Sequence, residues 1–493
     1  MKPIINENSC ESSGVQSAVK FGIKSSGLAH IFNVLRNQLY SDKILAVVRE
    51  YSCNAVDAMI DAGKKTEPIE VTLPNSMNPN FMVRDFGEGL TDKEIQDIYA
   101  FYGESTKRNT NEQTGMLGIG SKSAFAYGDN FIINSYVNGV KSSYNAFIDP
   151  SQVGQISKLS SESTTEADGI EIVVPVKSDD YEEFRNKARI LFEHFVVKPV
   201  IKGTKEFSYS TEDVLFKGEG WRWVNRNHQQ QWQIVREATV VMGNIGYPIN
   251  ENELNIHKLE KEDRETLSSL VTDSLVLEVP IGELDISASR EKLQYTDRTR
   301  ENLINALRKV RDELNTIVNE KFENSKTLFD AKILWGQVFD YGSPMYPLRD
   351  ALGSSLKFNG EPVGDDAFKG FRASDTGELW RMNKSYRSSR YKKEECYSIN
   401  CKPETLVIEM DAASWRGYLG RVLPLVINEG KDVYIVKFAN EKAKKEWKDE
   451  TGFDGKLTSM SSLTQHKLSE FEGYSKSSAV SGRKISSPKS SAK

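Results

Sequence analysis

Apolar positions in the first part of the chain recur at helical spacing. From Ile44 to Tyr51 they fall at i, i+3, i+4 and i+7, a stripe that predicts a helix capped by Ser41 and ended by Gly63. A second helix is predicted near 180–196. We therefore expect at least two helices, each with one buried face, in the first two hundred residues.

Short apolar runs between these helices predict strands. They lie at residues 69–73, 81–84, 131–137, 140–148 and 169–176. Asn138-Gly139 separates two of the runs by the two residues that favour a tight hairpin turn. Residues 1–200 are therefore expected to form a two-layer α/β sandwich with a mostly antiparallel sheet.

The pattern beyond residue 200 predicts further α/β units. Residues 205–325 contain an aromatic and polar stretch, then a loop rich in Ser and Asp that leads into a long charged helix. Within 326–473, residues 406–438 show an apolar strand, a helical stretch and a second apolar strand. The tail, 474–493, is Ser-rich with five basic and no acidic residues, and we expect it to be disordered. The predicted class is α+β.

Composition excludes several classes of protein. The net charge of −5 over 493 residues argues against general nucleic-acid binding, although a local basic patch stays open. Four scattered cysteines indicate a reducing compartment rather than a disulfide framework, and five scattered histidines form no metal-ligand pair. No signal peptide and no apolar run of about 20 residues is visible. A soluble, cytoplasmic protein with at most peripheral membrane contact is expected.

The segment REYSCNAVDA (49–58) carries the first candidate chemistry. Glu50, Asn54 and Asp57 fall at i, i+4 and i+7 and share one helix face. An amide oxygen can bind a hard divalent cation while a carboxylate polarises a neighbouring water. The alternative is the solvated face of a surface helix, which often carries such polar pairs.

The segment VRDFGEGL (83–90) follows a predicted strand. Asp85 stands at the strand end, where a carboxylate can accept a hydrogen bond from an exocyclic amine. Gly87 and Gly89 let the backbone turn tightly and approach a flat ligand. The alternative is an ordinary strand-to-helix turn. Thr91 and Glu94 then form a capping box that opens a helix near 92–102.

A second glycine motif, TGMLGIGSK (114–122), leads into a short apolar helix. Gly115, Gly118 and Gly120 precede that helix, whose unpaired N–H groups can face an anion, and Lys122 adds positive charge. The pattern is not a Walker A loop, because no Gly-Lys-Ser/Thr follows a four-residue gap.

The stretch between the two glycine motifs is small and polar. Residues 103–113 read GESTKRNTNEQ, which predicts a mobile flap over a phosphate tail. Ser105, Thr106 and Lys107 are its candidate contacts. The three motifs and the flap follow one another over about eighty residues, and this order is more specific than any single motif.

The order of these motifs resembles the ATP site of the GHKL ATPases. It runs E-x-x-x-N-x-x-D-A, D-x-G-x-G, a flap and then G-x-x-G-x-G. That family includes gyrase B, the ninety-kilodalton heat-shock chaperone, histidine kinases and MutL. The resemblance implies slow hydrolysis of ATP to ADP and phosphate with Mg²⁺, and an ATP-dependent homodimer. It makes residues 1–200 the ATP-binding domain and residues 205–325 a transducer-like middle domain.

The resemblance also implies roles for individual residues. Glu50 would be the general base for the attacking water, and Asn54 would ligate the Mg²⁺ that bridges the phosphates. Asp85 would bind the adenine amine, while the amides of Gly118 and Gly120 would cradle the phosphates. One departure concerns the strand at 169–176, where Ile170 follows Gly169 although the family often carries Thr at that point.

SREKLQ (289–294) resembles the catalytic loop of the chaperone's middle domain. In that family an Arg and a Gln of this loop reach the γ-phosphate, so the match implies catalytic roles for Arg290 and Gln294. Charge supplied from another domain would make hydrolysis wait for domain docking. The alternative is a surface loop followed by a salt-bridged helix.

A closer resemblance covers most of residues 16–310. Five segments together look like the rIIA-type rapid-lysis proteins of tailed phages. They are VVREYSCNAVDA, RDFGEGL, GIGSKSAFAYGD, DGIEIVVPV and LDISASREKLQYTDRTR. That resemblance implies an early protein that acts in the infected host, at the membrane, on lysis timing and on exclusion by prophages. Its host or phage partner is not named by the sequence.

Other functions for the same motifs stay open. One is a DNA-acting ATPase of the topoisomerase or MutL type, although no nuclease module and no strongly basic domain is visible. Another is a chaperone-like ATPase. The SREKLQ match favours it, whereas the absence of an evident chaperone-type dimerisation region argues against it. A histidine kinase is disfavoured, since no phospho-acceptor histidine lies on a helical hairpin before the motifs.

Overall fold

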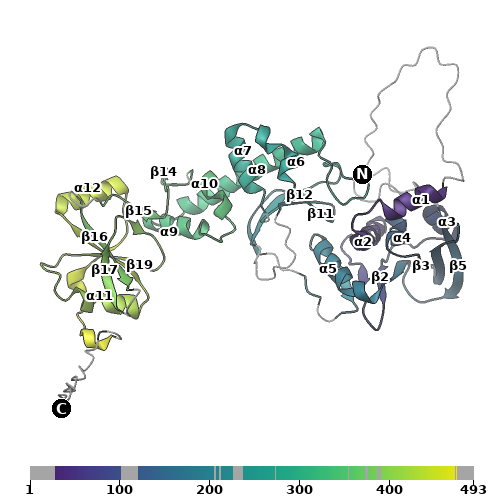
Figure 1. Ribbon diagram of the computed structural model, residues 1–493, viewed down its shortest axis with the longest axis horizontal. Coiled ribbons are helices and arrows are strands. Elements are labelled where there is room, and N and C mark those ends of the chain that lie inside the picture. The colour runs from purple at the N-terminus through teal and green to yellow at the C-terminus, as the bar shows by residue number, and fades with distance from the viewer. Residues whose placement is uncertain are drawn as a thin grey trace, which may run out of the picture. The chain divides into compact units, whose positions relative to one another are not determined.

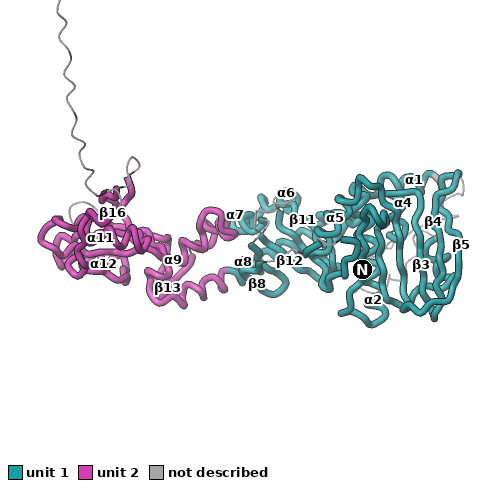
Figure 2. Tube along the Cα trace, turned by 90° about the horizontal axis from the view of Figure 1, so that it is seen from below, with its two compact units in different colours: residues 1–314 teal, residues 315–493 magenta. Residues whose placement is uncertain are grey.

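The computed structural model forms two compact units, residues 1–314 and 315–493 (Figure 2). It describes residues 28–100, 120–204, 207–209, 213–225, 237–272, 274–353, 355–371, 376–385, 390–471 and 474. The predicted flap at 103–113 and nearly all of the predicted disordered tail lie outside these residues. The boundary between the units falls inside helix α8 (Asp297–Glu323), and the sequences 1–200 and 205–314 share the first unit.

Helix α2 (Lys43–Asp61) is the helix predicted from the apolar stripe at Ile44 to Tyr51. Its N-cap is Asp42, whose carboxylate accepts the Leu45 N–H, so the cap assignment to Ser41 was wrong by one residue. The helix ends at Asp61 with Ala62 as its C-cap, and the predicted stop residue Gly63 follows with φ +75°, a left-handed conformation that costs glycine little. The cap and the glycine together set the length of α2.

A seven-stranded sheet forms one layer of the first unit. Its strands are β1 (Glu70–Thr72), β2 (Asn80–Arg84), β3 (Asn130–Val137), β4 (Val140–Ile148), β5 (Gly154–Ser163), β6 (Gly169–Pro175) and β7 (Val200–Lys202), in the order β5-β4-β3-β6-β2-β1-β7. Only β1 and β7 pair in parallel. The five predicted strands are confirmed within a residue or two, and Asn138 and Gly139 form the hairpin with positive φ.

Helices form the second layer, as predicted. They are α1 (Leu28–Asn37), α2, α3 (Asp92–Ala100), the 3₁₀ turn η2 (Gly120–Lys122), α4 (Ala124–Tyr127), the 3₁₀ turn η3 (Ser178–Asp180) and α5 (Tyr181–Phe192). Figure 1 shows α2 and α4 against the sheet. The rings of Phe81 and Phe184 lie 5.3 Å apart and those of Tyr51 and Phe131 lie 5.9 Å apart, so aromatic packing joins the layers.

A second sheet follows in the same unit. It contains β8 (Asp213–Gly218), β9 (Trp221–Asn225), β10 (Thr239–Met242), β11 (Ile245–Pro248) and β12 (Leu275–Val279), in the order β11-β10-β12-β9-β8. The helices are α6 (Glu251–Leu254), the 3₁₀ turn η5 (Ile256–Lys258), α7 (Lys261–Leu270) and α8. Trp221 and Trp223 are buried in this sheet and belong to its core.

The second unit is also α/β. It begins with the carboxyl-terminal part of α8. There follow α9 (Leu328–Val338), the 3₁₀ turn η6 (Tyr346–Leu348), α10 (Arg349–Leu352) and the short strands β13 (Lys357–Phe358), β14 (Glu361–Pro362), β15 (Ala367–Phe368) and β18 (Ile399–Asn400). A five-stranded sheet, β17-β16-β20-β19-β21, contains β16 (Gly377–Lys384), β17 (Tyr391–Glu395), β19 (Thr405–Glu409), β20 (Asp432–Phe438) and β21 (Leu457–Ser459).

Its remaining helical elements are α11 (Tyr418–Ile427), α12 (Glu441–Thr451) and the 3₁₀ turns η7 (Met460–Ser462) and η8 (Leu468–Glu470). The order β19, α11, β20 is the strand–helix–strand pattern predicted over 406–438. Across the parts of both units that the structure describes, no helix is both long and apolar enough to cross a bilayer.

Candidate functional site

The polar face of α2 is buried rather than solvated. Glu50 and Asp57 are each only 3% exposed, and Asn54 is half-buried. Burying a charge is costly unless another group compensates it. The surface-helix alternative for this motif therefore does not hold, and the partners of Glu50 become the informative feature.

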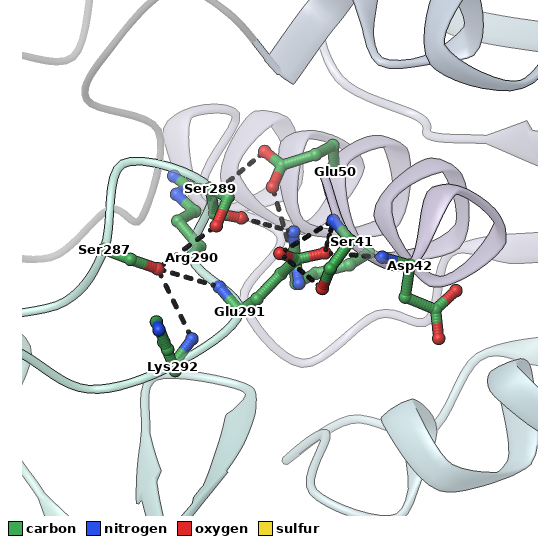
Figure 3. A network of polar contacts seen from close by, with 9 residues as sticks. Ser41, Asp42, Glu50, Ser287, Ser289, Arg290, Glu291 and Lys292 are labelled. Carbon is green, nitrogen blue, oxygen red and sulfur yellow. Dashed lines mark hydrogen bonds and ion pairs between the residues drawn. The ribbon is translucent and has the colours of Figure 1, made fainter. Parts of the chain in front are cut away.

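Two arginines bind the Glu50 carboxylate. Oε1 accepts a hydrogen bond from Arg49 Nε at 3.1 Å, and Oε2 accepts one from Arg290 Nη1 at 3.0 Å (Figure 3). Arg49 is 2% and Arg290 8% exposed. Burial lowers the pKa of Arg290, but the negative charge of Glu50 together with smaller contributions from Cys53, Tyr247 and Asp57 outweighs burial, and the pKa ends above the ordinary value. The three side chains form one buried charged cluster.

The contact between Arg290 and Glu50 joins two parts of the unit that are 240 residues apart. Arg290 belongs to the loop after β12, beside the second sheet, whereas Glu50 lies on α2 of the first layer. The sequence placed both residues at one site, and the structure brings them into direct contact. Gln294, the other residue proposed from this loop, has an exposed side chain.

Gly120 lies directly against the Glu50 carboxylate. A Cβ atom built at Gly120 would stand 2.4 Å from Glu50 Oε2, so a larger residue there would displace the Glu50 carboxylate. Tyr51 ties the same segment to α2, because its hydroxyl donates to Ser121 O at 3.1 Å and accepts the Ala124 N–H at 3.2 Å. The second glycine motif therefore begins its helix beside the candidate base.

Asp85 is fixed by the backbone around it. Its side chain is 5% exposed, and Oδ1 accepts the N–H groups of Gly87 at 2.9 Å and Ile170 at 3.1 Å. A Cβ at Gly169 would lie 2.2 Å from Asp85 O, so β6 passes very close to this residue. The departure at Ile170 thus falls next to the predicted adenine contact, where Ile170 contributes its backbone N–H.

Both glycines of the D-x-G-x-G motif lie close to neighbouring atoms, and at Gly89 no side chain fits. Gly89 has φ +71°, and a Cβ there would lie 2.3 Å from Tyr136 O on β3. A Cβ at Gly87 would lie 3.1 Å from Asp85 Oδ1 and 3.2 Å from Ala58 O on α2. The Thr91–Glu94 capping box is also confirmed, with Thr91 N donating to Glu94 Oε2 at 2.8 Å.

Lys122 reaches the carboxyl end of α3. It is 6% exposed, and its Nζ donates to Ile98 O at 2.8 Å and to Ser121 Oγ at 3.1 Å. Burial lowers the pKa of Lys122 to about 8. Its charge lies at the carboxyl end of a helix, where a cation is favourable. The described residues do not include the other candidates of this region, which are Ser105, Thr106, Lys107, Gly115 and Gly118.

Sequence reasoning missed two residues of this site. Arg49 binds both Glu50 and the backbone of Ser289, and Glu291 binds the amino end of α2. Arg49 carries no periodic signal, because neighbouring helix residues point in different directions. Glu291 stands within the SREKLQ match, but nothing local indicates a partner 250 residues away.

The described residues contain no group of three or more His, Cys, Asp or Glu side chains that could hold a metal ion. Asn54 nevertheless offers an amide oxygen one turn from Glu50. Mg²⁺ usually takes only one or two protein ligands and completes its shell with phosphate oxygens and water. The residues present therefore fit a Mg²⁺ that arrives with a polyphosphate.

Residues 43–179 match the family model described as histidine kinase-, DNA gyrase B-, and HSP90-like ATPase. The match begins at the first residue of α2 and reaches the 3₁₀ turn before α5. No curated protein matches the chain. Residues 43–179 are therefore a GHKL-type ATPase domain. Arg49, Glu50 and Asp85 lie inside this domain, whereas Arg290 lies outside it.

Proposed function

We propose that this protein is an ATP-hydrolysing conformational switch in which a loop beside the second sheet controls the general base. The single observation that supports this most is the buried contact of Arg290 with Glu50. In this contact the Arg290 guanidinium, which lies outside the segment 43–179, binds the Glu50 carboxylate of α2. Glu50 is the residue proposed to activate the attacking water. Such an arrangement makes hydrolysis depend on how the loop is docked.

In the proposed reaction Glu50 takes a proton from the attacking water. The Arg290 guanidinium first neutralises Glu50, and then pairs with the γ-phosphate, which is a stronger anion and accepts bidentate bonds. This exchange of partners releases the Glu50 carboxylate to act as a base. Mg²⁺, when bound, would neutralise charge on the phosphates. Arg49 stays on Glu50 Oε1 and keeps the carboxylate oriented.

Asp85 is the proposed acceptor for the adenine amine, and Asn54 the proposed Mg²⁺ ligand. The remaining proposed nucleotide contacts are those of the glycine motifs and the flap: Gly87, Gly89, Ser105, Thr106, Lys107, Gly115, Gly118, Gly120 and Lys122. Gln294 of the same loop is also proposed to reach the γ-phosphate, and its exposed side chain is free to turn without movement of the loop backbone.

Asp85→Asn should abolish ATP binding while the fold survives. The amide retains an oxygen for the Gly87 and Ile170 N–H groups and places an NH₂ donor where adenine needs an acceptor. Such a mispaired buried group costs about 1–3 kcal/mol or more, so the affinity should fall by at least about 5- to 150-fold and beyond detection at the upper end. Calorimetric titration with a non-hydrolysable ATP analogue measures this. Wild-type affinity in the variant would move the adenine site elsewhere.

ATP should also drive self-association into a two-fold dimer. GHKL-type domains commonly dimerise when they bind ATP, and we propose the segments 1–20 and 103–120 as contact elements. A ligand that favours the dimer must bind it better than the monomer, so association should follow analogue concentration. Sedimentation with and without the analogue measures this.

Deleting residues 1–20 should weaken the ATP-dependent association and leave nucleotide binding intact. The contradicting result is a chain that stays monomeric at concentrations on the order of tens of micromolar while its ATP site is saturated. The protein would then be a monomeric ATPase. That result would exclude the proposed dimer but would not contradict the proposal that the protein binds ATP.

We further propose that the switch acts in a phage-infected host, on lysis timing and prophage exclusion. The support is the resemblance of five segments between 16 and 310 to rIIA-type proteins. A DNA-acting role is not favoured at a net charge of −5. Disruption of the gene in the phage should change the time of lysis, and an unchanged time would refute this biological role while leaving the ATPase intact.

A further inference from the structure

Residues 285–294 form a closed loop that rests on the amino end of α2, and we call it the docking loop. Gln294 N donates to Asp285 O at 2.8 Å and Ser287 N donates to Lys292 O at 2.9 Å, so the loop is closed by its own backbone. Figure 3 shows the Glu291 side chain of this loop beside Ser41 and Asp42. Its contacts with that helix come from three consecutive residues, Ser289, Arg290 and Glu291.

Glu291 binds the backbone at the start of α2. Its carboxylate accepts the Ser41 N–H at 3.0 and 3.1 Å, the Ser41 hydroxyl at 3.0 Å and the Asp42 N–H at 2.9 Å. Burial raises the pKa of Glu291, but these donors outweigh it and the pKa lies below the ordinary value. A carboxylate at a helix amino end is also favoured by the helix dipole.

Ser289 is held on the other side of Arg290. Its backbone oxygen accepts a hydrogen bond from Arg49 Nη2 at 2.6 Å, and Arg49 is itself 2% exposed. The same arginine binds Glu50 Oε1 through Nε. Arg49 therefore connects the backbone of the docking loop to the proposed general base.

Arg290, between these two contacts, has an uncommon backbone conformation. Its φ is +55°, in the left-handed region that side chains other than glycine rarely adopt. Such a residue persists when its surroundings hold it on both sides. Here α2 holds Ser289 through Arg49 and holds Glu291 through the Ser41 and Asp42 amides. The guanidinium thereby reaches Glu50, 3.0 Å from Oε2.

We propose that Glu291 is a positioning residue, which latches the docking loop onto the amino end of α2 and so sets where Arg290 stands relative to Glu50. This inference rests on the proposed ATPase function. Glu291 need not touch nucleotide, because its carboxylate is used by the Ser41 and Asp42 donors. It acts on the rate through Arg290.

Glu291→Ala should lower kcat and leave the affinity for an ATP analogue nearly unchanged. Misplacing a reacting group by about 1 Å costs up to about 10²-fold in rate, and we expect a loss of that order. Glu291→Gln should restore part of the rate, because its amide oxygen still accepts one of the N–H groups. The matched control is Glu301→Gln, which changes an exposed carboxylate on α8 and should behave as wild type.

A double-mutant cycle separates positioning from general destabilisation. In an Arg290→Ala background, Glu291→Ala should have no further effect on kcat, because the group it positions is gone. An equal loss of rate in both backgrounds would show that Glu291 acts only through stability, and would overturn the proposal. Unchanged kcat in Glu291→Ala, with an active wild type, would overturn it as well.

Hydrogen exchange of the full-length chain supplies a readout that does not depend on turnover. The Ser41 and Asp42 amides should exchange faster in Glu291→Ala than in wild type, and unchanged protection would refute the latch. Absence of hydrolysis in the wild type would instead refute the proposed ATPase function. The two failures are therefore distinguishable.

Discussion

Arg290→Ala should lower the rate of ATP hydrolysis by about 10³- to 10⁵-fold, which is the usual contribution of an arginine that stabilises phosphoryl transfer. The affinity for ATP should change far less, because a contact made mainly in the transition state appears in the rate and not in binding. Single-turnover kinetics and calorimetric titration of the same variant measure the two quantities.

The structure gives this variant a second expected effect. Without Arg290 the buried Glu50 carboxylate keeps Arg49 as its one remaining partner in the cluster. Breaking a buried ion pair by removing one partner costs about 3–5 kcal/mol. Thermal unfolding must therefore accompany the kinetics, so that the rate is compared at a temperature where both chains are folded.

Two further substitutions define the role of the guanidinium. Arg290→Lys keeps the charge but loses the planar, bidentate donor group, so it should recover only part of the rate. Arg264→Ala removes an exposed arginine of α7 in the same unit and should leave the rate unchanged. If Arg290→Ala hydrolyses ATP as fast as the wild type, the role of the docking loop in catalysis is refuted.

Glu50→Gln should lower turnover by about 10²- to 10⁴-fold and retain ATP binding, because a positioned general base contributes that much to the rate. Glutamine is a sharper substitution than alanine here. Its amide oxygen can still accept a hydrogen bond from one arginine of the cluster, whereas Glu50→Ala would leave Arg49 and Arg290 buried without any acceptor at this position.

Glu50→Ala should also retain ATP and lose turnover, provided that the chain stays folded. Asp61→Asn, which changes an exposed carboxylate at the end of the same helix, is the matched control. A Glu50→Gln chain with wild-type turnover and intact binding would remove Glu50 from its role. Another carboxylate, or water activated by the phosphates themselves, would then have to supply the base.

Local signals account for what could be predicted well. The stripe from Ile44 to Tyr51 defined α2, the Asn138-Gly139 pair defined the β3–β4 hairpin, and the Thr91–Glu94 capping box opened α3. Each of these signals acts between residues that are close in sequence, so periodicity and turn chemistry are sufficient to read it.

Strands without such a signal were missed. β5 is ten residues long and nearly every one of its side chains is exposed, so no alternation of apolar and polar residues marks it. β7 has only three residues, and its pairing with β1 connects segments about 130 positions apart. Only the tertiary pairing of backbone groups made these segments strands.

The motifs alone brought Glu50, Asp85 and Arg290 together as candidates for one site, because the types of residue and their order carry the chemistry. The tertiary structure decided how the charges pair. It put Arg290 and Arg49 on Glu50, directed Lys122 to the end of α3, and set Glu291 on the amino end of α2. Hydrogen bonds between polar groups up to 250 residues apart leave no periodicity in a sequence, since only the folded chain brings donor and acceptor within reach.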